Sequence, residues 1–272
     1  MLVSQSSLSK QIKAMEDELG VVLFDRSHGV KLTPVGKQVA LHIEAILNEY
    51  DRMLFKTKEH QKGGMQKLCI ASLYEMVYYG ITDMIVTFEH KIANFHIESK
   101  ECDHARMFSL LESGQTDIAI GYQEFWPAKM NFDVVPLRKD TLALVVNKKH
   151  PLAQKTCISL SEARNCVFCF PQEDAALFEF YCESCSKHGF MPQLTRSDVR
   201  LSTIKRYILA GMRSTLQIHE RAINYFYEPD FTIVNLQDSP TLTLSLLYNR
   251  NIISDIGLRF IKYAEHWHRK ME

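Results

Sequence analysis

Residues 3–33 read VSQSSLSKQIKAMEDELGVVLFDRSHGVKLT, and this stretch decides the organisation of the N-terminal part of the protein. Four apolar residues recur at intervals of four, three and four, and they predict one apolar stripe of a helix: Leu8, Ile12, Met15 and Leu19. Ser4 is suited to cap the start of this helix, because its side-chain oxygen can accept a backbone N–H. Gly20 is suited to end it, because glycine tolerates the positive φ of a helix stop.

The opposite face of this predicted helix is polar and carries two cations. Its side chains are those of Gln5, Ser6, Ser9, Lys10 and Lys13. Hydroxyl, amide and ammonium groups are suited to base edges and phosphates in the major groove of DNA. A solvated face is the commoner meaning of such a pattern, so the helix alone leaves both interpretations open.

The residues after Gly20 predict a two-stranded wing. Residues 21–26 are strand-like, residues 27–29 are turn-like and residues 30–33 return. Arg26 and Lys31 would then be available to the DNA backbone or minor groove. Thr33 and Pro34 are the N-cap and first-position signals of another helix.

The string SQSSLSKQI…LG..LFDR…LT..G at residues 4–36 resembles the winged helix-turn-helix of LysR-type transcriptional regulators. The resemblance implies a protein that binds double-stranded DNA. It implies DNA contacts through one helix and its wing, with the residues Ser4, Gln5, Ser6, Ser9, Lys10, Lys13, Arg26, Lys31 and Thr33.

Members of the family carry a further segment before this point, which forms the first helix and most of the second. Met1 stands where the family usually has the Leu that closes the second helix. Without that segment the apolar stripe would lack packing partners. Burying each side chain of the stripe would stabilise the fold by roughly 1.5–3 kcal/mol. We therefore expect residues 1–33 to form a partial winged helix-turn-helix that binds DNA weakly or not at all, while an N-terminally extended version binds in a gel shift. The alternative is a headless ligand-binding or oligomerisation module.

Residues 34–64 predict a long linker helix followed by a hinge at Gly63-Gly64. Apolar residues keep helical spacing along it at Val35, Val39, Ile43, Ile46, Leu47, Tyr50 and Leu54. Such a seam usually pairs with a copy of itself, although it could pack on its own domain. The resemblance implies a homodimer through this helix, alone or within a tetramer.

Beyond the hinge, strand-like and helical segments alternate, which predicts α/β architecture with a mostly parallel sheet. The expected strands are residues 67–72, 95–101, 116–122 and two within 134–153, with helices at 77–89 and 104–113. The segments LLESGQTDIAIG, LALVVNKKHPLA and GF.P resemble the LysR effector-binding region, which has a two-lobed periplasmic-binding-protein-like fold. This implies an effector domain at residues 65–272, with lobe one at 65–143 and 241–272 and lobe two at 144–240. The chain would cross between lobes near 144–146 and 239–241, and a last helix would span about 255–268.

A cleft between two such lobes is the expected site of a small-molecule effector, because strand ends and helix N-termini converge there. The candidate lining residues follow predicted strands: Ser72, Tyr74, Cys102, Asp103, Gly121, Tyr122, Phe170, Gln172, Arg200, Ser202 and Thr203. Hydroxyl groups near helix starts suit a carboxylate. The identity of the effector is not written in these residues, and no cofactor is expected.

Composition excludes several other classes of protein. The 272 residues are 46% hydrophobic with a formal net charge of zero. No apolar run of about 18 residues and no secretion signal appears, so we expect a cytoplasmic protein without a membrane span. The pairs at 166–169 and 182–185 have C-x-x-C spacing, but one is strand-like and the other helical, so we expect free thiols and no metal. Neither HWH at 266–268 nor CDH at 102–104 predicts a catalytic set, so no enzyme is expected.

Overall fold

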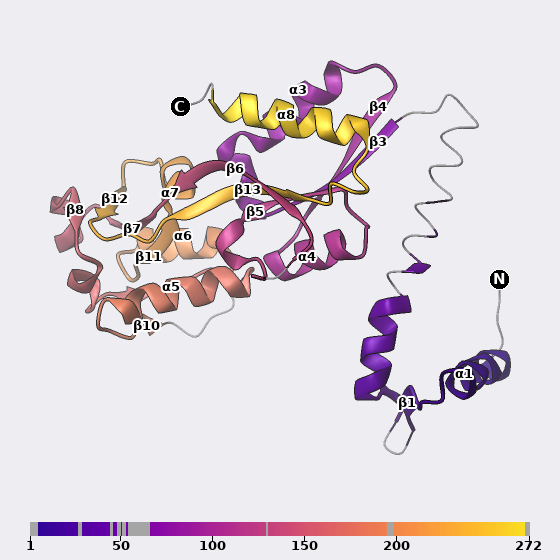
Figure 1. Cartoon of the computed structure of the whole chain (residues 1–272). Helices are drawn as coiled ribbons and strands as arrows, with labels where there is room; N and C mark the ends of the chain where they lie inside the picture. Colours follow the sequence, from indigo (N-terminus) through magenta and orange to yellow (C-terminus); the bar gives the residue numbers. More distant parts are fainter. Residues whose placement is uncertain are drawn as a thin grey trace. The chain divides into compact units, whose positions relative to one another are not determined.

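The computed structural model describes residues 5–26, 29–43, 46–47, 50, 53, 66–128, 130–194 and 199–269 (Figure 1). The chain divides into two compact units. The N-terminal unit comprises Met1–Gly64 with Glu112–Gly114, and the C-terminal unit comprises Met65–Leu111 with Gln115–Glu272. Each unit is described separately below.

The N-terminal unit contains the predicted helix and wing. Helix α1 spans Gln5–Leu19, and Gly20 follows it with a φ of +67°. Strands β1 (Phe24–Asp25) and β2 (Lys31–Leu32) pair antiparallel, and residues 34–43 are helical. The helix and its glycine stop are therefore confirmed, and the wing strands are shorter than expected. Ser4 lies outside the described residues.

Hydrogen bonds around Leu23 join the three parts of this unit. The Glu16 carboxylate on α1 accepts the backbone N–H groups of Leu23 (2.7 Å) and Phe24 (3.1 Å). The Thr33 N–H donates to the Leu23 carbonyl (2.9 Å), and the Thr33 hydroxyl donates to the Val22 carbonyl (2.8 Å). The same hydroxyl oxygen accepts the Gly36 N–H (2.9 Å), which confirms Thr33 as the N-cap.

Residues 34–43, 46–47, 50 and 53 are helical and carry an exposed apolar surface; we call these described residues the second helix of this unit. Within the described part of the unit, the exposed members are Val35, Leu41, Ile46, Leu47, Tyr50 and Met53. Val39 and Ile43 are half-buried. Leu54 and the expected hinge at residues 63–64 lie outside the described residues.

The C-terminal unit contains a five-stranded sheet with the order β4-β3-β5-β13-β6. Its strands are β3 (Gln66–Ser72), β4 (Phe95–Glu101), β5 (Ile118–Tyr122), β6 (Asp133–Asp140) and β13 (Leu242–Tyr248). The associated helices are η1 (Tyr74–Tyr79), α3 (Ile81–His90), α4 (His104–Glu112), η2 (Gln123–Phe125) and α8 (Asp255–Arg269). Helices α3 and α8 cover one face and α4 the other (Figure 1), and Phe88 meets Phe260 with ring centroids 5.2 Å apart.

A four-stranded sheet with the order β11-β7-β12-β8 forms the second lobe. Its strands are β7 (Leu142–Asn147), β8 (Cys157–Ile158), β11 (Thr215–Ile218) and β12 (Phe231–Leu236). A short parallel pair, β9 (Val167–Phe168) and β10 (Gln193–Leu194), lies in the same part of the chain. The helices of this lobe are η3 (Pro151–Gln154), η4 (Leu160–Ala163), α5 (Ala175–Lys187), α6 (Leu201–Leu209) and α7 (His219–Tyr225).

Two expectations about the sheets are corrected. The sheets are mixed rather than mostly parallel, because β13 pairs antiparallel with β5 and β6, and β7 pairs antiparallel with β11 and β12. Leu142 and Ala143 belong to β7 of the second sheet, so the first crossing lies at Thr141 and not at residues 144–146. A single residue separates β6 from β7, and a continuous β-like run does not reveal where the chain changes sheet.

The helix expected around the second C-x-x-C pair is confirmed. Helix α5 contains Cys182 and Cys185, and Gly189 follows it with a φ of +81°. Among the described residues, no three His, Cys, Asp or Glu side chains come together in a way that could hold a metal ion. None of the helices formed by the described residues is long and apolar enough to cross a membrane.

Candidate nucleic-acid interface and interlobe site

The N-terminal unit presents five of the predicted DNA-contacting side chains to solvent. They are Ser9, Lys10 and Lys13 on α1, Arg26 after β1 and Lys31 on β2. Gln5 and Ser6 lie in the first turn of α1. The Thr33 hydroxyl is already engaged in the cap and in the bond to Val22, so its availability to DNA stays a prediction.

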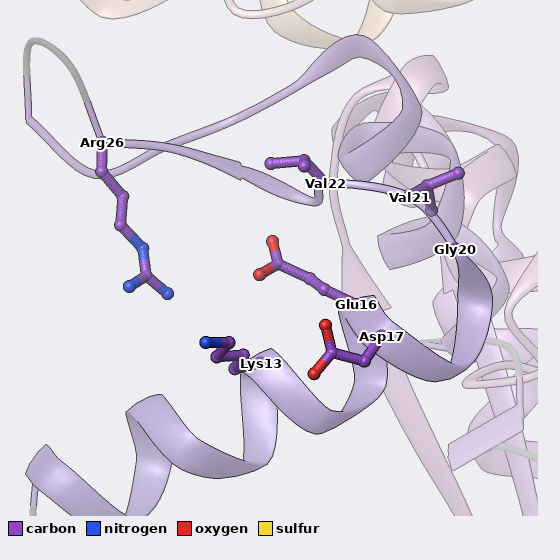
Figure 2. A pocket seen from close by; sticks show the side chains of 7 residues that line it. All are labelled: Lys13, Glu16, Asp17, Gly20, Val21, Val22 and Arg26. Atoms are coloured by element: carbon purple, nitrogen blue, oxygen red, sulfur yellow. The ribbon is translucent and has the colours of Figure 1, made fainter.

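A hollow lies between the C-terminal half of α1 and the start of the wing (Figure 2). Lys13 and Arg26 point toward it from opposite sides, and the carboxylates of Glu16 and Asp17 lie near them. Its other lining residues are Gly20, Val21 and Val22. Hydrogen bonds from the Leu23 and Phe24 backbone lower the pKa of Glu16, so this carboxylate stays charged and holds the wing to α1.

The predicted effector residues differ in burial in the C-terminal unit. Ser72, Cys102, Gly121, Tyr122 and Phe170 are buried, whereas Tyr74, Gln172, Arg200 and Ser202 are exposed and Asp103 and Thr203 are half-buried. Cys102 N–H donates to the Ser72 carbonyl (3.0 Å), so those two strand ends do meet. Arg200, Ser202 and Thr203 lie at the start of α6, whose buried residues pack in a separate apolar cluster from the one that contains Tyr122 and Phe170.

Polar side chains from both lobes form a buried group that we call the interlobe cluster. Lobe one contributes Glu75 and Tyr79 from η1, His104 from α4, Tyr122 from β5 and Asp140 from β6. Lobe two contributes Asp174 before α5, Tyr181 from α5 and Arg221 from α7. All eight are buried.

Arg221 connects α7 to both η1 and α5. Its Nη1 pairs with Oε1 of Glu75, and its Nη2 donates to the Tyr181 hydroxyl (3.0 Å). Burial alone would lower the pKa of Arg221, but Tyr181 and Glu75 raise it, so the guanidinium stays charged. Its Nε has no hydrogen-bond partner among the described residues. A buried pair of this kind is costly to break on one side only.

Asp174 joins the N-termini of two helices. Its Oδ2 pairs with Nδ1 of His104 and accepts the His104 backbone N–H (3.2 Å). Its Oδ1 accepts the N–H groups of Ala176 (3.0 Å) and Leu177 (3.3 Å), which makes it the N-cap of α5. Burial raises the pKa of Asp174, but the bonds from His104 and the backbone outweigh burial and hold it below its ordinary value.

Tyr79, Tyr122 and Asp140 complete the cluster. The Tyr79 hydroxyl donates to Oδ2 of Asp140 (2.6 Å) and lies 3.0 Å from the Tyr122 hydroxyl. Asp140 also accepts the N–H of Glu220 at the start of α7 (3.1 Å) and that of Thr141 (2.7 Å). Burial raises the pKa of both tyrosines well above the usual value, so both stay protonated. This chain of bonds ties β6 to α7.

Of the eight members of this cluster, only Tyr122 is among the predicted effector-binding residues. The predicted effector residues were those that stand just after strands, whereas Glu75, Tyr181 and Arg221 lie within helices. One local signal was present, since Asp174 stands directly before the helical run of α5 and is suited to be its cap. Nothing local marks Glu75 as the partner of Arg221, which lies 146 residues away.

The His104–Asp174 pair predicts a pH dependence of stability. Because the pKa of Asp174 is held below its ordinary value of 3.8, the pair stabilises the folded chain above that value and is lost as pH falls through the folded-state pKa. Asp174→Asn should therefore be less stable than the wild type at neutral pH, with the difference shrinking in acid. Urea unfolding at neutral pH and at about pH 3 measures this difference. A difference that stays constant across this range would contradict the assignment.

Two family models match the chain. A model described as "LysR substrate binding domain" matches residues 61–266, and one described as "Bacterial regulatory helix-turn-helix protein, lysR family" matches residues 1–37. An uncharacterised HTH-type transcriptional regulator, YcgK of Bacillus subtilis, is 23% identical over 92% of this chain and 82% of its own length. The transcriptional dual regulator GltC of the same organism is 25% identical over 78% of this chain and 70% of its own length.

Solved structures share the fold. Full-length BenM, solved as a mutant, has a TM-score of 0.67 with 19% identity, covering 100% of this chain and 90% of its own. CbnR, a LysR family transcriptional regulator, has a TM-score of 0.66 with 17% identity, covering 97% and 90%. Full-length CbnR complexed with its target DNA has a TM-score of 0.61 with 18% identity, covering 98% and 91%.

Proposed function

Because this chain belongs to the LysR family of bacterial transcriptional regulators, we propose that it binds duplex DNA as a homodimer under the control of a small-molecule effector held between its two lobes. The observation that carries the DNA-binding part is the order of helix, wing and second helix, with Lys10, Lys13, Arg26 and Lys31 exposed. The match of the helix-turn-helix model to residues 1–37 argues against the alternative of a headless binding module.

In this proposal α1 enters the major groove. Gln5 is the candidate for base readout, because a glutamine side chain can make two hydrogen bonds to adenine. Lys10 and Lys13 are assigned to guanine or phosphate, and Arg26 and Lys31 to the backbone beside the wing. Ser4, Ser6, Ser9 and Thr33 are assigned to short contacts with phosphate or base edges.

The second helix of the N-terminal unit supports the homodimer. Its exposed apolar side chains include Leu41, Ile46 and Leu47, each more than half exposed within the described part of the unit. An isolated helix with such a surface gains stability by pairing with a copy of itself. The effector would then shift the population of quaternary states that differ in the spacing of the two DNA-reading units.

A selection experiment tests the proposal. The full chain is incubated with a random duplex library at low salt, where phosphate contacts are strongest, and the enriched sequence is used in gel shifts. Lys10→Ala and Lys13→Ala are each expected to weaken binding and to lower the slope of affinity against salt by about 1 for each lost phosphate contact. Gln5→Ala is expected to relax base preference at one position.

Lys187→Ala is the matched control, because Lys187 is an exposed lysine of the other unit that pairs with Glu183, four residues earlier on α5. It should leave affinity and salt slope unchanged. Failure of both this chain and the N-terminally extended version to enrich any sequence, or equal slopes for Lys13→Ala and the wild type, would count against the proposed interface.

A further inference from the structure

We propose that Arg221 is the anchor for a carboxylate group of the effector, and that Glu75 occupies this anchor when the effector is absent. The inference rests on the proposed function, in which the effector binds between the lobes. It adds the chemical class of the ligand, a small carboxylate, and names the group of the protein that the ligand replaces.

The position of the ion pair is the first support. Glu75 belongs to η1 of lobe one and Arg221 to α7 of lobe two, and their side chains are only 6% and 3% exposed. A carboxylate is thus already bound by a buried guanidinium where the two lobes meet. The protein supplies that carboxylate from the opposite lobe, as a bound ligand would do from within the cleft.

The unfilled bonding capacity of Arg221 is the second support. A guanidinium has five N–H donors in a planar fork that can hold a carboxylate with two parallel bonds. Glu75 meets only Nη1, Nη2 is used by Tyr181, and Nε is buried without a partner among the described residues. A carboxylate placed against the edge formed by Nε and one Nη would make the paired contact that Glu75 does not.

A second unfilled polar atom lies in the same cluster. Nε2 of His104 is also buried without a partner among the described residues, while its Nδ1 faces Asp174. Two aromatic rings lie against this imidazole, that of Phe125 at 4.7 Å and that of Tyr122 at 5.9 Å between centroids. The Tyr122 hydroxyl meets Tyr79 of η1, the helix that carries Glu75. The cluster therefore offers an anion anchor, a further polar contact and aromatic walls.

Charge selects the class of ligand. A carboxylate that replaces Glu75 leaves the charge beside Arg221 unchanged, whereas a cation would be repelled and a neutral ligand would leave the guanidinium uncompensated. Tyr74 and Val77 on η1 are 46% and 51% exposed, so η1 lies at the surface and a displaced Glu75 has a short way to water. Releasing Glu75 also removes a tie between the lobes, which links binding to a change in their relative angle.

Chemical rescue tests the anchor. Glu75→Ala removes CH₂–COO⁻, which differs from acetate by one hydrogen, so acetate is the probe. Loss of one partner of the buried pair is expected to lower the melting temperature of the full chain by about 10 °C. Millimolar sodium acetate should raise that temperature toward the wild-type value. In this variant acetate no longer competes with the tethered Glu75 carboxylate, whose effective concentration in the wild type is also in the millimolar range. Sodium chloride at the same ionic strength should not.

Three controls make the result specific. The wild type should show no difference between acetate and chloride, and neither should Glu183→Ala, which removes an exposed carboxylate. The double variant Glu75→Ala/Arg221→Met should not respond to acetate, because the anchor is gone. If Glu75→Ala does not fold, Glu75→Gln keeps the shape of the side chain, and its urea midpoint should rise in acetate relative to chloride.

An equal response of the single and double variants, or no response of a folded Glu75 variant to acetate, would overturn the inference. The readout is separate from DNA binding, so the two proposals can fail independently. Rescue by acetate, with no duplex selected by either this chain or its N-terminally extended version, would count against the proposed function alone. Duplex selection without rescue would count against the anchor alone.

Discussion

Arg221→Met is expected to lower the free energy of unfolding of the C-terminal unit by about 3–5 kcal/mol. The substitution replaces the guanidinium with an unbranched apolar side chain and leaves the Glu75 carboxylate, on a side chain only 6% exposed, without its partner. It also removes the donor to the Tyr181 hydroxyl. Because domains are typically stable by only about 5–15 kcal/mol, the loss would be a large share of the total.

Urea unfolding followed by tryptophan fluorescence measures this loss, since both tryptophans of the chain, Trp126 and Trp267, lie in the C-terminal unit. Arg250→Met is the matched control. Arg250 is 71% exposed and pairs with Asp133 at 3.4 Å, so its replacement should leave the free energy of unfolding close to the wild-type value. The double variant Glu75→Gln/Arg221→Met should recover much of the loss, because no charge is then left buried. Equal losses for Arg221→Met and Arg250→Met would contradict the prediction.

Gly36→Ala is expected to disrupt the N-terminal unit and with it DNA binding. A Cβ atom at this position would lie 2.1 Å from the Leu23 carbonyl oxygen, which is backbone and cannot rotate away. The start of the second helix must then move away from Leu23, the residue directly before β1. This shift breaks the Thr33 bonds to Leu23 and Gly36, together worth about 2 kcal/mol.

Hydrogen exchange of the backbone amides of residues 23–36 should report this change directly, and the gel shift with the selected duplex should report its effect on affinity. Gln38→Ala is the control, because Gln38 is exposed on the same helix two residues later. It should leave both measurements unchanged. A Gly36→Ala protein with wild-type exchange rates and affinity would show that the close approach to Leu23 does not constrain this unit.

The N-terminal unit could be predicted from sequence because its signals are local. The spacing from Leu8 to Leu19, the glycine stop at Gly20 and the cap at Thr33 each depend on residues within a few positions of one another. Glu16 shows the limit of this reasoning, since its polar side chain reads as part of a solvated face. In the structure its carboxylate reaches seven and eight residues along the chain to hold the wing.

The interlobe site was only partly predictable. The rule that ligands bind at strand ends led to Ser72, Cys102 and Tyr122, which are buried around the ends of β3, β4 and β5. The same rule led to Arg200, which lies exposed at the start of α6. Strand ends mark an edge of a sheet, but they do not tell which helices of the other lobe face that edge.

The order of the chain was determined by sequence alone: a helix with a polar face, a wing, a second amphipathic helix and then alternating strands and helices. These features follow from periodicity and capping, which act between neighbours in the chain. Tertiary structure alone decided that Glu75 meets Arg221 and that His104 meets Asp174, across 146 and 70 residues. In a medium without water, a buried charged group is stabilised by the opposite charge that lies next to it. Only the crossing of the chain between two sheets brings Glu75 next to Arg221 and His104 next to Asp174.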